Sequence, residues 1–233
     1  MLKTRIGSAE EVEALGLNFR IFVPESISAV SEAKGLVLLV HGRAGNFDVM
    51  WVFARPKSVG EKIVFIAPEA PIEDQLGGFS WWKVEGRSGG VASREEMDEA
   101  AGKLEKFLVS AKEYFNIPRN IKTVTAGFSQ GAGTVCSLAF KSPEVFEGVG
   151  LLAGFVPQVE QEVDPKFRQD MNLPEFFMAS GTEDKIIPIE TARKGKDYLE
   201  QCGAELNYLE APVGHKVSSD GIKALNQWLA KHF

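Results

Sequence analysis

The chain has 233 residues, of which 44% are apolar and 25% charged, a globular composition that excludes disordered, collagen-like and coiled-coil chains. Its 32 acidic and 26 basic residues give a net charge of −6, so no basic face for nucleic acid is indicated. No apolar run predicts a membrane span, and no signal peptide is recognisable. With only two cysteines, Cys136 and Cys202, we expect a cytoplasmic protein without disulfides and one domain over residues 1–233.

Short apolar runs predict the strands of a sheet. An alternating segment, Phe19–Val23, predicts an antiparallel edge strand. Runs that are too short and too uniformly apolar for surface helices are typical of parallel strands covered on both faces. These runs are Gly35–Val40, Ile63–Ala67, Thr123–Phe128, Val149–Ala153 and Phe176–Ser180. Glu205–Leu209 alternates more and predicts a second edge strand.

Longer amphipathic segments between these strands predict helices over Ser93–Tyr114, Gln130–Phe140, Ile189–Gln201 and Ser218–His232. The first opens with Ser93 and Glu96 at the spacing of a capping box, and Gly203 follows the third as a stop signal. The alternation predicts an α/β fold, with a mostly parallel sheet and helices on both faces. Only about 20 residues separate the fourth and fifth apolar runs, so we expect no large lid domain.

A candidate nucleophile lies between a predicted strand and a predicted helix. Residues 127–131 read Gly-Phe-Ser-Gln-Gly and fit G-x-S-x-G, the pattern of a strand–turn–helix elbow that exposes Ser129. Alternatively, Ser129 only caps the helix. A dinucleotide-binding interpretation of the same glycines is disfavoured, because Cys136 occupies the third glycine position.

A serine hydroxyl needs a neighbouring base to become a nucleophile, and the chain has three histidines. His215 follows the last predicted strand, in a loop at the carboxyl edge of the sheet, and is the candidate base. His41 is an alternative base, although a His-Gly pair that opens a loop is more typical of shaping it. His232 is the penultimate residue and is expected to be exposed and inert.

The base in turn needs a carboxylate that holds its tautomer. Asp184 follows the strand Phe176–Ser180 and is the candidate, with the adjacent Glu183 as its rival. The alternative is that both acids are solvated turn residues. The order Ser129, Asp184, His215 along the chain is the order expected for α/β-hydrolases.

An oxyanion hole in such a sheet takes one backbone N–H from the residue after the nucleophile and one from the loop after an earlier strand. The candidates are Gln130 and Arg43, the latter in the loop His41-Gly42-Arg43-Ala44-Gly45. Alternatively, the Arg43 side chain binds an anionic substrate.

Together, the segments HGRAG, GFSQG, GTEDKIIP and GH resemble the phospholipase/carboxylesterase family of the α/β-hydrolase fold, which includes acyl-protein thioesterases and small bacterial esterases. Gly181-x-x-Asp184-x-x-Ile187-Pro188 is similar to a family segment that favours Asp184 over Glu183. Residues 77–82, GGFSWW, resemble a Trp-Phe element beside the family's site, and residues 43–46 resemble the small microbial esterases most. The resemblance implies a Ser/Asp/His carboxylesterase-type hydrolase acting on small or medium acyl esters or thioesters.

Aromatic residues in loops at strand ends are candidates for the rim of an open substrate cleft, with core packing as the alternative for each. These residues are Phe47, Trp51, Phe79, Trp81, Trp82 and Phe155. The sequence shows no metal-binding motif, so neither a metal nor another cofactor is expected. A non-catalytic binding protein of the same fold and an acyltransferase remain alternative functions, and a homodimer is left open.

Overall fold

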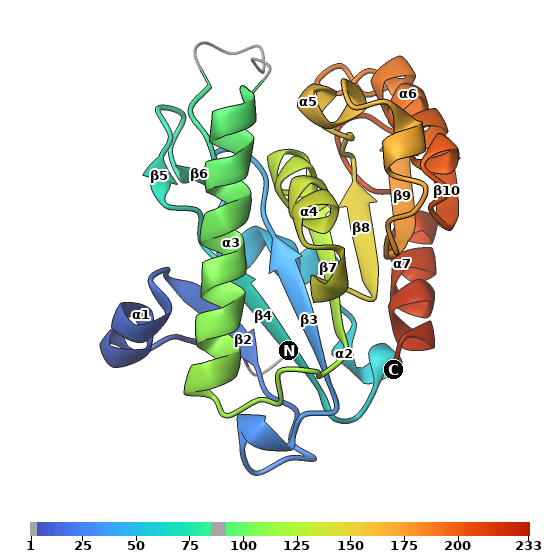
Figure 1. The fold of residues 1–233 in the computed structure, drawn as a ribbon. Helices are drawn as coiled ribbons and strands as arrows, with labels where there is room; N and C mark the ends of the chain where they lie inside the picture. The colour runs from blue at the N-terminus through green and yellow to red at the C-terminus, as the bar shows by residue number, and fades with distance from the viewer. Residues whose placement is uncertain (1–3, 85–91) are drawn as a thin grey trace.

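The computed structural model describes residues 4–84 and 92–233, whose arrangement Figure 1 shows. Within these residues, eight strands form one sheet in the order β1-β2-β4-β3-β7-β8-β9-β10. β2 pairs antiparallel with β1 and β4, and the other neighbours are parallel, as the sequence predicts. The strands are β1 (Thr4–Ile6), β2 (Phe19–Phe22), β3 (Gly35–Val40), β4 (Ile63–Pro68), β7 (Thr123–Phe128), β8 (Gly148–Leu152), β9 (Glu175–Gly181) and β10 (Leu206–Ala211).

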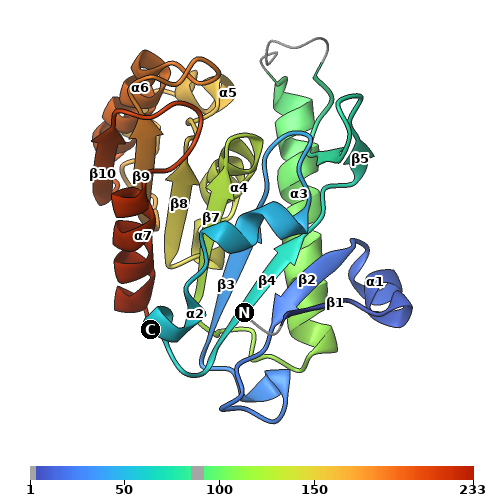
Figure 2. The same cartoon turned by 180° about the vertical axis from the view of Figure 1, so that it is seen from behind.

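Helices cover both faces of this sheet, as the views in Figures 1 and 2 show. One face packs against α3 (Arg94–Tyr114), α4 (Gln130–Lys141) and α6 (Ile189–Gln201). The other packs against the 3₁₀ helix η2 (Phe47–Val52), α2 (Pro56–Val59) and α7 (Ser219–Lys231). Because both faces are covered, β3 and β4 are buried along their whole length, which explains their uniformly apolar sequences.

The predicted helix boundaries are confirmed by their caps. Ser93 and Glu96 form both hydrogen bonds of a capping box at the start of α3. The helix α6 ends at Gln201, and Gly203 adopts a φ of +79°, a conformation that glycine reaches without strain. Ser218 caps α7 by accepting a hydrogen bond from the N–H group of Gly221.

The N-terminal edge differs from the prediction. β2 is not the edge strand, because β1 pairs with it on the outside, and α1 (Ala9–Leu15) connects the two. β1 has three residues and α1 has seven, too few for either to show a clear hydrophobic period. A separate hairpin of β5 (Ile72–Glu73) and β6 (Phe79–Ser80) was also not predicted.

The prediction that His232, the penultimate residue, is exposed is also wrong. Its ring packs edge-on against the Trp228 indole, with 4.8 Å between the ring centroids, and its side chain is 11% exposed. Burial lowers the pKa of His232, although Glu175, with a carboxylate oxygen 3.7 Å from Nε2, opposes this effect. The C-terminal segment is therefore held against the sheet.

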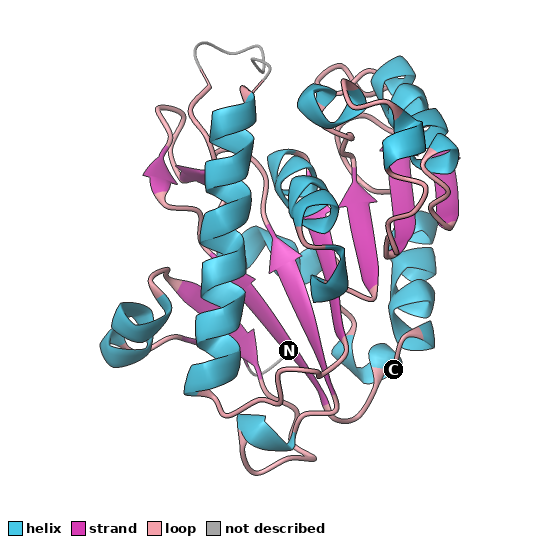
Figure 3. Cartoon of the chain, viewed as in Figure 1, coloured by secondary structure: helices cyan, strands magenta, loops and turns pink. Residues whose placement is uncertain are grey.

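The carboxyl ends of the central strands share one edge, toward which the arrows of β3 and β8 point in Figure 3, and β9 runs parallel to β8. Between β8 and β9 the chain forms only α5 (Gln158–Gln161) and the 3₁₀ helix η4 (Pro165–Phe167), so no lid domain is inserted there. Among the described residues, no helix is long and apolar enough to span a membrane.

Candidate active site

Ser129 occupies a sharp turn between β7 and α4. Its φ of +53° and ψ of −114° are rarely adopted by residues other than glycine, so the surrounding structure must hold it there. Its N–H group donates to the carbonyl oxygen of Leu152 on β8, 2.9 Å away. The hydroxyl makes no capping bond to α4, so the alternative of a helix-capping serine is wrong.

Glycines allow the chain to reverse so tightly at this turn. A Cβ atom on Gly127 would lie 2.3 Å from the carbonyl oxygen of Gly131, and one on Gly131 would lie 2.2 Å from that of Val40. Both distances are far below van der Waals contact, and the obstructing atoms belong to backbone. The G-x-S-x-G spacing thus follows from packing the start of α4 against the ends of β7 and β3.

The structure brings together the side chains of the predicted nucleophile Ser129, its base His215 and the carboxylate Asp184. The Nε2 atom of His215 lies 2.9 Å from the Ser129 hydroxyl oxygen, and its Nδ1 atom lies 2.7 Å from an Asp184 carboxylate oxygen. Because an ionised carboxylate only accepts hydrogen bonds, it favours the tautomer with a proton on Nδ1. Nε2 is then left to accept the proton of the serine hydroxyl.

Asp184, rather than Glu183, meets the imidazole. The other oxygen of Asp184 accepts hydrogen bonds from the N–H groups of Ile186 and Ile187, at 2.8 and 3.0 Å. Its side chain is only 1% exposed, whereas Glu183 is exposed. These backbone bonds hold the carboxylate in one orientation, as a partner of a catalytic base requires.

Close packing between two loops explains how Asp184 and His215 meet. A Cβ atom on Gly181 would lie 2.3 Å from the carbonyl oxygen of Val213, so the end of β9 touches the loop that carries His215. The N–H group of Glu183 donates to the same carbonyl oxygen, at 3.1 Å. The imidazole also packs against the Phe128 ring, with 5.1 Å between centroids, which brings it beside the Ser129 turn.

His41 is fully buried, and both of its ring nitrogens are bonded to backbone. Nδ1 lies 2.7 Å from the carbonyl oxygen of Gly42, and Nε2 accepts the N–H of Ala70 at 2.9 Å. Burial lowers the pKa of His41 to about 4, so the ring is neutral at physiological pH. His41 therefore shapes its loop, and the alternative that it acts as the base is wrong.

The loop of residues 41–46, hereafter the Arg43 loop, lies against the Ser129 turn. A Cβ atom on Gly42 would lie 3.0 Å from the carbonyl oxygen of Phe128 and 3.1 Å from the Cβ of Ser129. Gln130 begins α4, and its N–H group has no acceptor among the described residues. The Arg43 loop, at Gly42, and the start of α4, at Gln130, thus both adjoin the serine.

The Arg43 side chain bonds to the protein itself. Its Nε atom lies 3.0 Å from a carboxylate oxygen of Asp74, and an Nη atom donates to the carbonyl oxygen of Val84 at 3.2 Å. The Arg43 side chain is 15% exposed. Its charge therefore already has a carboxylate partner, which disfavours the alternative of an anion-binding side chain.

Comparison with known proteins identifies the family. The sequence profile of the phospholipase/carboxylesterase family matches residues 23–233. This chain belongs to the phospholipase/carboxylesterase family. Acyl-protein thioesterase 1 of Emericella nidulans is 24% identical over 205 residues, which cover 78% of this chain and 82% of the relative. This membership confirms the predicted class, a carboxylesterase-type serine hydrolase.

Solved structures confirm the predicted α/β-hydrolase fold. Esterase PE8 superposes with a TM-score of 0.76 at 21% identity, covering 89% of this chain and 97% of that protein. The carboxylesterase of Bacillus cereus gives a TM-score of 0.75 at 21% identity, covering 97% and 100% of the two chains. Both likenesses thus cover most of this chain.

The aromatic residues expected at the rim of an open substrate cleft divide into two groups. Phe47, Trp81 and Trp82 are 9%, 2% and 4% exposed and lie in the core, so for these three the expected rim position is corrected to core packing. The partly exposed residues are Trp51, Phe79 and Phe155. Strand-end aromatics have the same sequence signature in both settings, because rim and core both favour apolar side chains.

Sequence reasoning missed two features around this site. The Gln130 side chain accepts the N–H of Trp81 at 2.8 Å and donates to the carbonyl oxygen of Trp82 at 3.0 Å, which ties that segment to α4. Asp74 and Ser80 contact the Arg43 loop from the β5–β6 hairpin. No motif marks these contacts, since the partners lie more than 30 positions apart in the sequence. The described residues contain no cluster of three or more His, Cys, Asp or Glu side chains that could hold a metal ion.

Proposed function

We propose that this chain hydrolyses carboxylic esters, and thioesters as an alternative, through an acyl-enzyme formed on Ser129. The observation that carries the proposal is the continuous chain of hydrogen bonds from the Ser129 hydroxyl through His215 to Asp184, with lengths of 2.9 and 2.7 Å. Each distance suits transfer of a proton along the chain. A buried carboxylate that faces an imidazole stabilises the imidazolium that forms when the serine loses its proton.

The reaction then proceeds in two halves. The Ser129 oxygen attacks the carbonyl carbon while Nε2 of His215 takes the hydroxyl proton, and the carbonyl oxygen becomes an oxyanion. Collapse of this tetrahedral intermediate expels the alcohol or thiol, which receives the proton from His215. A water molecule, activated by the same imidazole, attacks the acyl-enzyme and releases the acid. Throughout, Asp184 holds the imidazole and stays ionised.

The backbone N–H groups of Arg43 and Gln130 are the proposed donors to the oxyanion. The Gln130 group lies at the start of a helix, where the helix dipole favours negative charge. Donors that are held in place before the reaction stabilise the developing charge without reorganising, and loss of one costs on the order of 10²–10³ in turnover. The partly exposed Trp51, Phe79 and Phe155 are the remaining candidates for contacts with a small or medium acyl group.

The two cysteines are structural residues in this proposal, and their state supports a cytoplasmic location for the protein. Cys136 and Cys202 are buried and not joined to each other. Burial raises the pKa of both thiols, which lowers the fraction of reactive thiolate. Free, unreactive thiols fit a reducing compartment.

Replacement of the serine tests the proposal. Ser129→Ala should lower turnover of p-nitrophenyl esters by about 10⁴- to 10⁶-fold and abolish labelling by a fluorophosphonate, while circular dichroism is unchanged. Ser93→Ala is the matched control, because it removes the serine that caps α3. It should cost about 1 kcal/mol of stability and leave turnover intact.

The outcomes separate the alternative functions. Undiminished ester hydrolysis by Ser129→Ala would contradict catalysis by this serine. A wild-type protein that forms no fluorophosphonate adduct would instead be a non-catalytic binding protein of the same fold. A wild-type enzyme that converts esters mainly into new esters when an alcohol is added would be an acyltransferase. A panel of esters and thioesters of graded length then defines the preferred acyl group and leaving group.

A further inference from the structure

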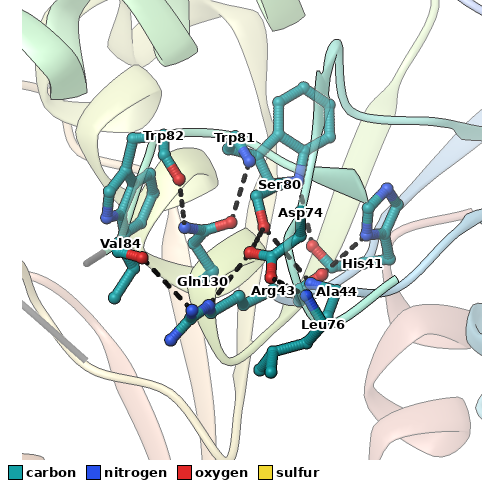
Figure 4. A network of polar contacts seen from close by, with 11 residues as sticks. His41, Arg43, Ala44, Asp74, Leu76, Ser80, Trp81, Trp82, Val84 and Gln130 are labelled. Carbon is teal, nitrogen blue, oxygen red and sulfur yellow. Dashed lines mark hydrogen bonds and ion pairs between the residues drawn. The ribbon is translucent and has the colours of Figure 1, made fainter. Parts of the chain in front are cut away.

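A buried carboxylate, Asp74, lies in the turn of the β5–β6 hairpin and faces the Arg43 loop, as Figure 4 shows. One of its oxygens accepts hydrogen bonds from Nε of Arg43 at 3.0 Å and from the Ser80 hydroxyl at 2.7 Å. The other accepts the N–H of Leu76 at 2.9 Å. With 4% of its side chain exposed, Asp74 has exchanged water for these three donors.

Through Ser80, the same carboxylate also reaches the backbone of the loop. The Ser80 oxygen accepts the N–H of Ala44 at 3.2 Å while its hydroxyl donates to Asp74. Because the hydroxyl proton is committed to the carboxylate, the lone pairs of the oxygen are directed toward Ala44. Asp74 is therefore bonded to Arg43 directly and to the next residue through one hydroxyl.

The Arg43 loop needs such support, because its conformation is not a relaxed one. Ala44 adopts a φ of +54°, which is unfavourable for a residue with a Cβ atom. The peptide group that joins Gly42 to Arg43 is held at its carbonyl oxygen, which lies 2.7 Å from Nδ1 of His41. In a trans peptide the N–H points opposite to the carbonyl, so the direction of the Arg43 N–H depends on contacts at both ends.

The charge on Asp74 is maintained by its donors. Burial alone would raise the pKa of Asp74, but the hydrogen bonds from Leu76, Ser80 and Arg43 outweigh burial and lower it. The carboxylate is therefore ionised throughout the range in which an esterase is assayed. An ionised acceptor also binds the guanidinium and the hydroxyl more strongly than a neutral one.

We propose that Asp74 is a positioning residue, whose carboxylate holds the Arg43 loop so that the Arg43 N–H group can donate to the oxyanion. This inference rests on the function proposed above. A positioning role differs from a purely structural one in its effect on kinetics. The oxyanion that the Arg43 N–H group binds exists in the transition state and not in the bound substrate. Loosening the loop should therefore lower kcat and leave KM nearly unchanged.

The principal test is Asp74→Asn, which keeps the size of the side chain and an acceptor for Leu76, but replaces the oxygen that serves Arg43 and Ser80 with an amide nitrogen. We expect kcat to fall about 10- to 100-fold, less than the 10²–10³ that follows complete loss of a donor. Affinity for a trifluoromethyl ketone should weaken in parallel, because its adduct with Ser129 also places an oxyanion in the hole.

The matched control is Glu11→Gln. Glu11 is also a mostly buried carboxylate bonded to an arginine, Arg5, at 2.6 and 2.7 Å, but it lies on α1, away from the Arg43 loop. This variant should lose stability while its kcat and its affinity for the ketone stay at wild-type values. It thereby separates loss of a buried ion pair from loss of loop positioning.

A second variant keeps the test decisive if Asp74→Asn does not fold. Ser80→Ala removes the link from Asp74 to Ala44 but keeps the direct bond between Asp74 and Arg43. It should lower kcat about 3- to 10-fold, with the same parallel loss of ketone affinity. Where both fold, the double variant should be no worse than Asp74→Asn, because the two residues act through one chain of bonds.

The outcomes are distinct from those for the proposed function. Unchanged kcat in Asp74→Asn or, if that variant is unfolded, in Ser80→Ala would overturn the inference and leave catalysis by Ser129 intact. A loss of kcat with unchanged ketone affinity would also overturn it. Failure of the function itself would appear as undiminished hydrolysis in Ser129→Ala.

Discussion

Two loops at the same edge of the sheet each carry a histidine, and the two imidazole rings differ in their burial and in their hydrogen-bond partners. In the Arg43 loop, His41 has no exposed surface, and both ring nitrogens are bonded to backbone groups. In the loop after β10, the His215 side chain is 23% exposed, and both ring nitrogens are bonded to side chains that can carry protons or charge.

The difference shows that the partners of an imidazole, more than its place in the sequence, decide what it can do. A ring that bonds a carbonyl oxygen and an amide N–H has one proton with a fixed place, and protonation of its second nitrogen would break a bond in the core. A ring between a carboxylate and a hydroxyl can accept the hydroxyl proton and keep its orientation. His41 therefore contributes to stability and to the shape of the Arg43 loop, and His215 takes part in the proposed chemistry.

The largest expected effect comes from removing the second histidine. His215→Asn should lower kcat/KM for p-nitrophenyl esters by about 10⁴- to 10⁶-fold, because the serine then has no base. The free energy of unfolding in urea should change by less than about 1 kcal/mol, since the lost bonds lie at a partly exposed loop. Steady-state kinetics and urea titrations measure the two quantities.

The same replacement at the other histidine is the matched control. His41→Asn should destabilise the fold by about 2–4 kcal/mol, because buried backbone groups lose their partners and a cavity forms. If His41→Asn instead lost as much activity as His215→Asn at unchanged stability, the assignment of roles to the two rings would be wrong.

The sequence was sufficient for the elements that this comparison uses. Parallel strands end at one edge, so residues 129, 184 and 215, each placed just after a strand, were expected to meet there. The capping box of α3 and the stop at Gly203 were equally readable, because their signals are local. The alternation of strands and helices along the chain already predicts how these elements assemble into one parallel sheet.

The sequence was insufficient wherever tertiary contacts decide the outcome. Trp81 could equally have lined a cleft, but its indole donates to the carbonyl oxygen of His41 and lies in the core. Asp74 has no motif, and only the folded hairpin brings it to Arg43. β1 needs its pairing with β2 to be a strand at all, because three residues carry too little pattern.

An intermediate effect is expected on the pH dependence of stability. The folded-state pKa of His41 is about 4, below its ordinary value of 6.5, so the unfolded chain takes up a proton first as the pH falls. Stability from this ring is fully present above about pH 6.5 and is lost as the pH falls toward 4. Between pH 7 and pH 5 the loss should be about 2 kcal/mol, measured by urea unfolding.

His41→Asn should flatten this dependence, because the titrating group is gone. His232→Asn is the control: burial also lowers the pKa of His232, but nearby Glu175 opposes the shift, so most of the dependence should remain. Carboxylates whose pKa values are lowered, such as Asp74, lose their contribution only at lower pH. A His41 variant with the full wild-type dependence would show that the buried ring does not remain neutral.

The smallest expected effect on turnover separates two neighbouring glycines beside the Arg43 loop. Gly77 and Gly78 have φ values of +88° and +66°, so alanine at either position costs about 1 kcal/mol of backbone strain. A Cβ atom on Gly77 would meet nothing within 4 Å, whereas one on Gly78 would lie 2.4 Å from the carbonyl oxygen of Ala44. Gly78→Ala must therefore displace the loop and should cost about 1–3 kcal/mol more.

Turnover distinguishes the two variants more sharply than stability does. Gly77→Ala should keep wild-type kcat, because its strain stays within the hairpin. In Gly78→Ala, the shift of the Ala44 carbonyl changes the orientation of the peptides that precede it, including the one that carries the Arg43 N–H. Its kcat should fall several-fold at unchanged KM, as expected when a transition-state contact weakens. Equal kcat in the two variants would mean that the Arg43 loop can move without affecting the reaction, and that the hairpin does not control the position of the oxyanion donor.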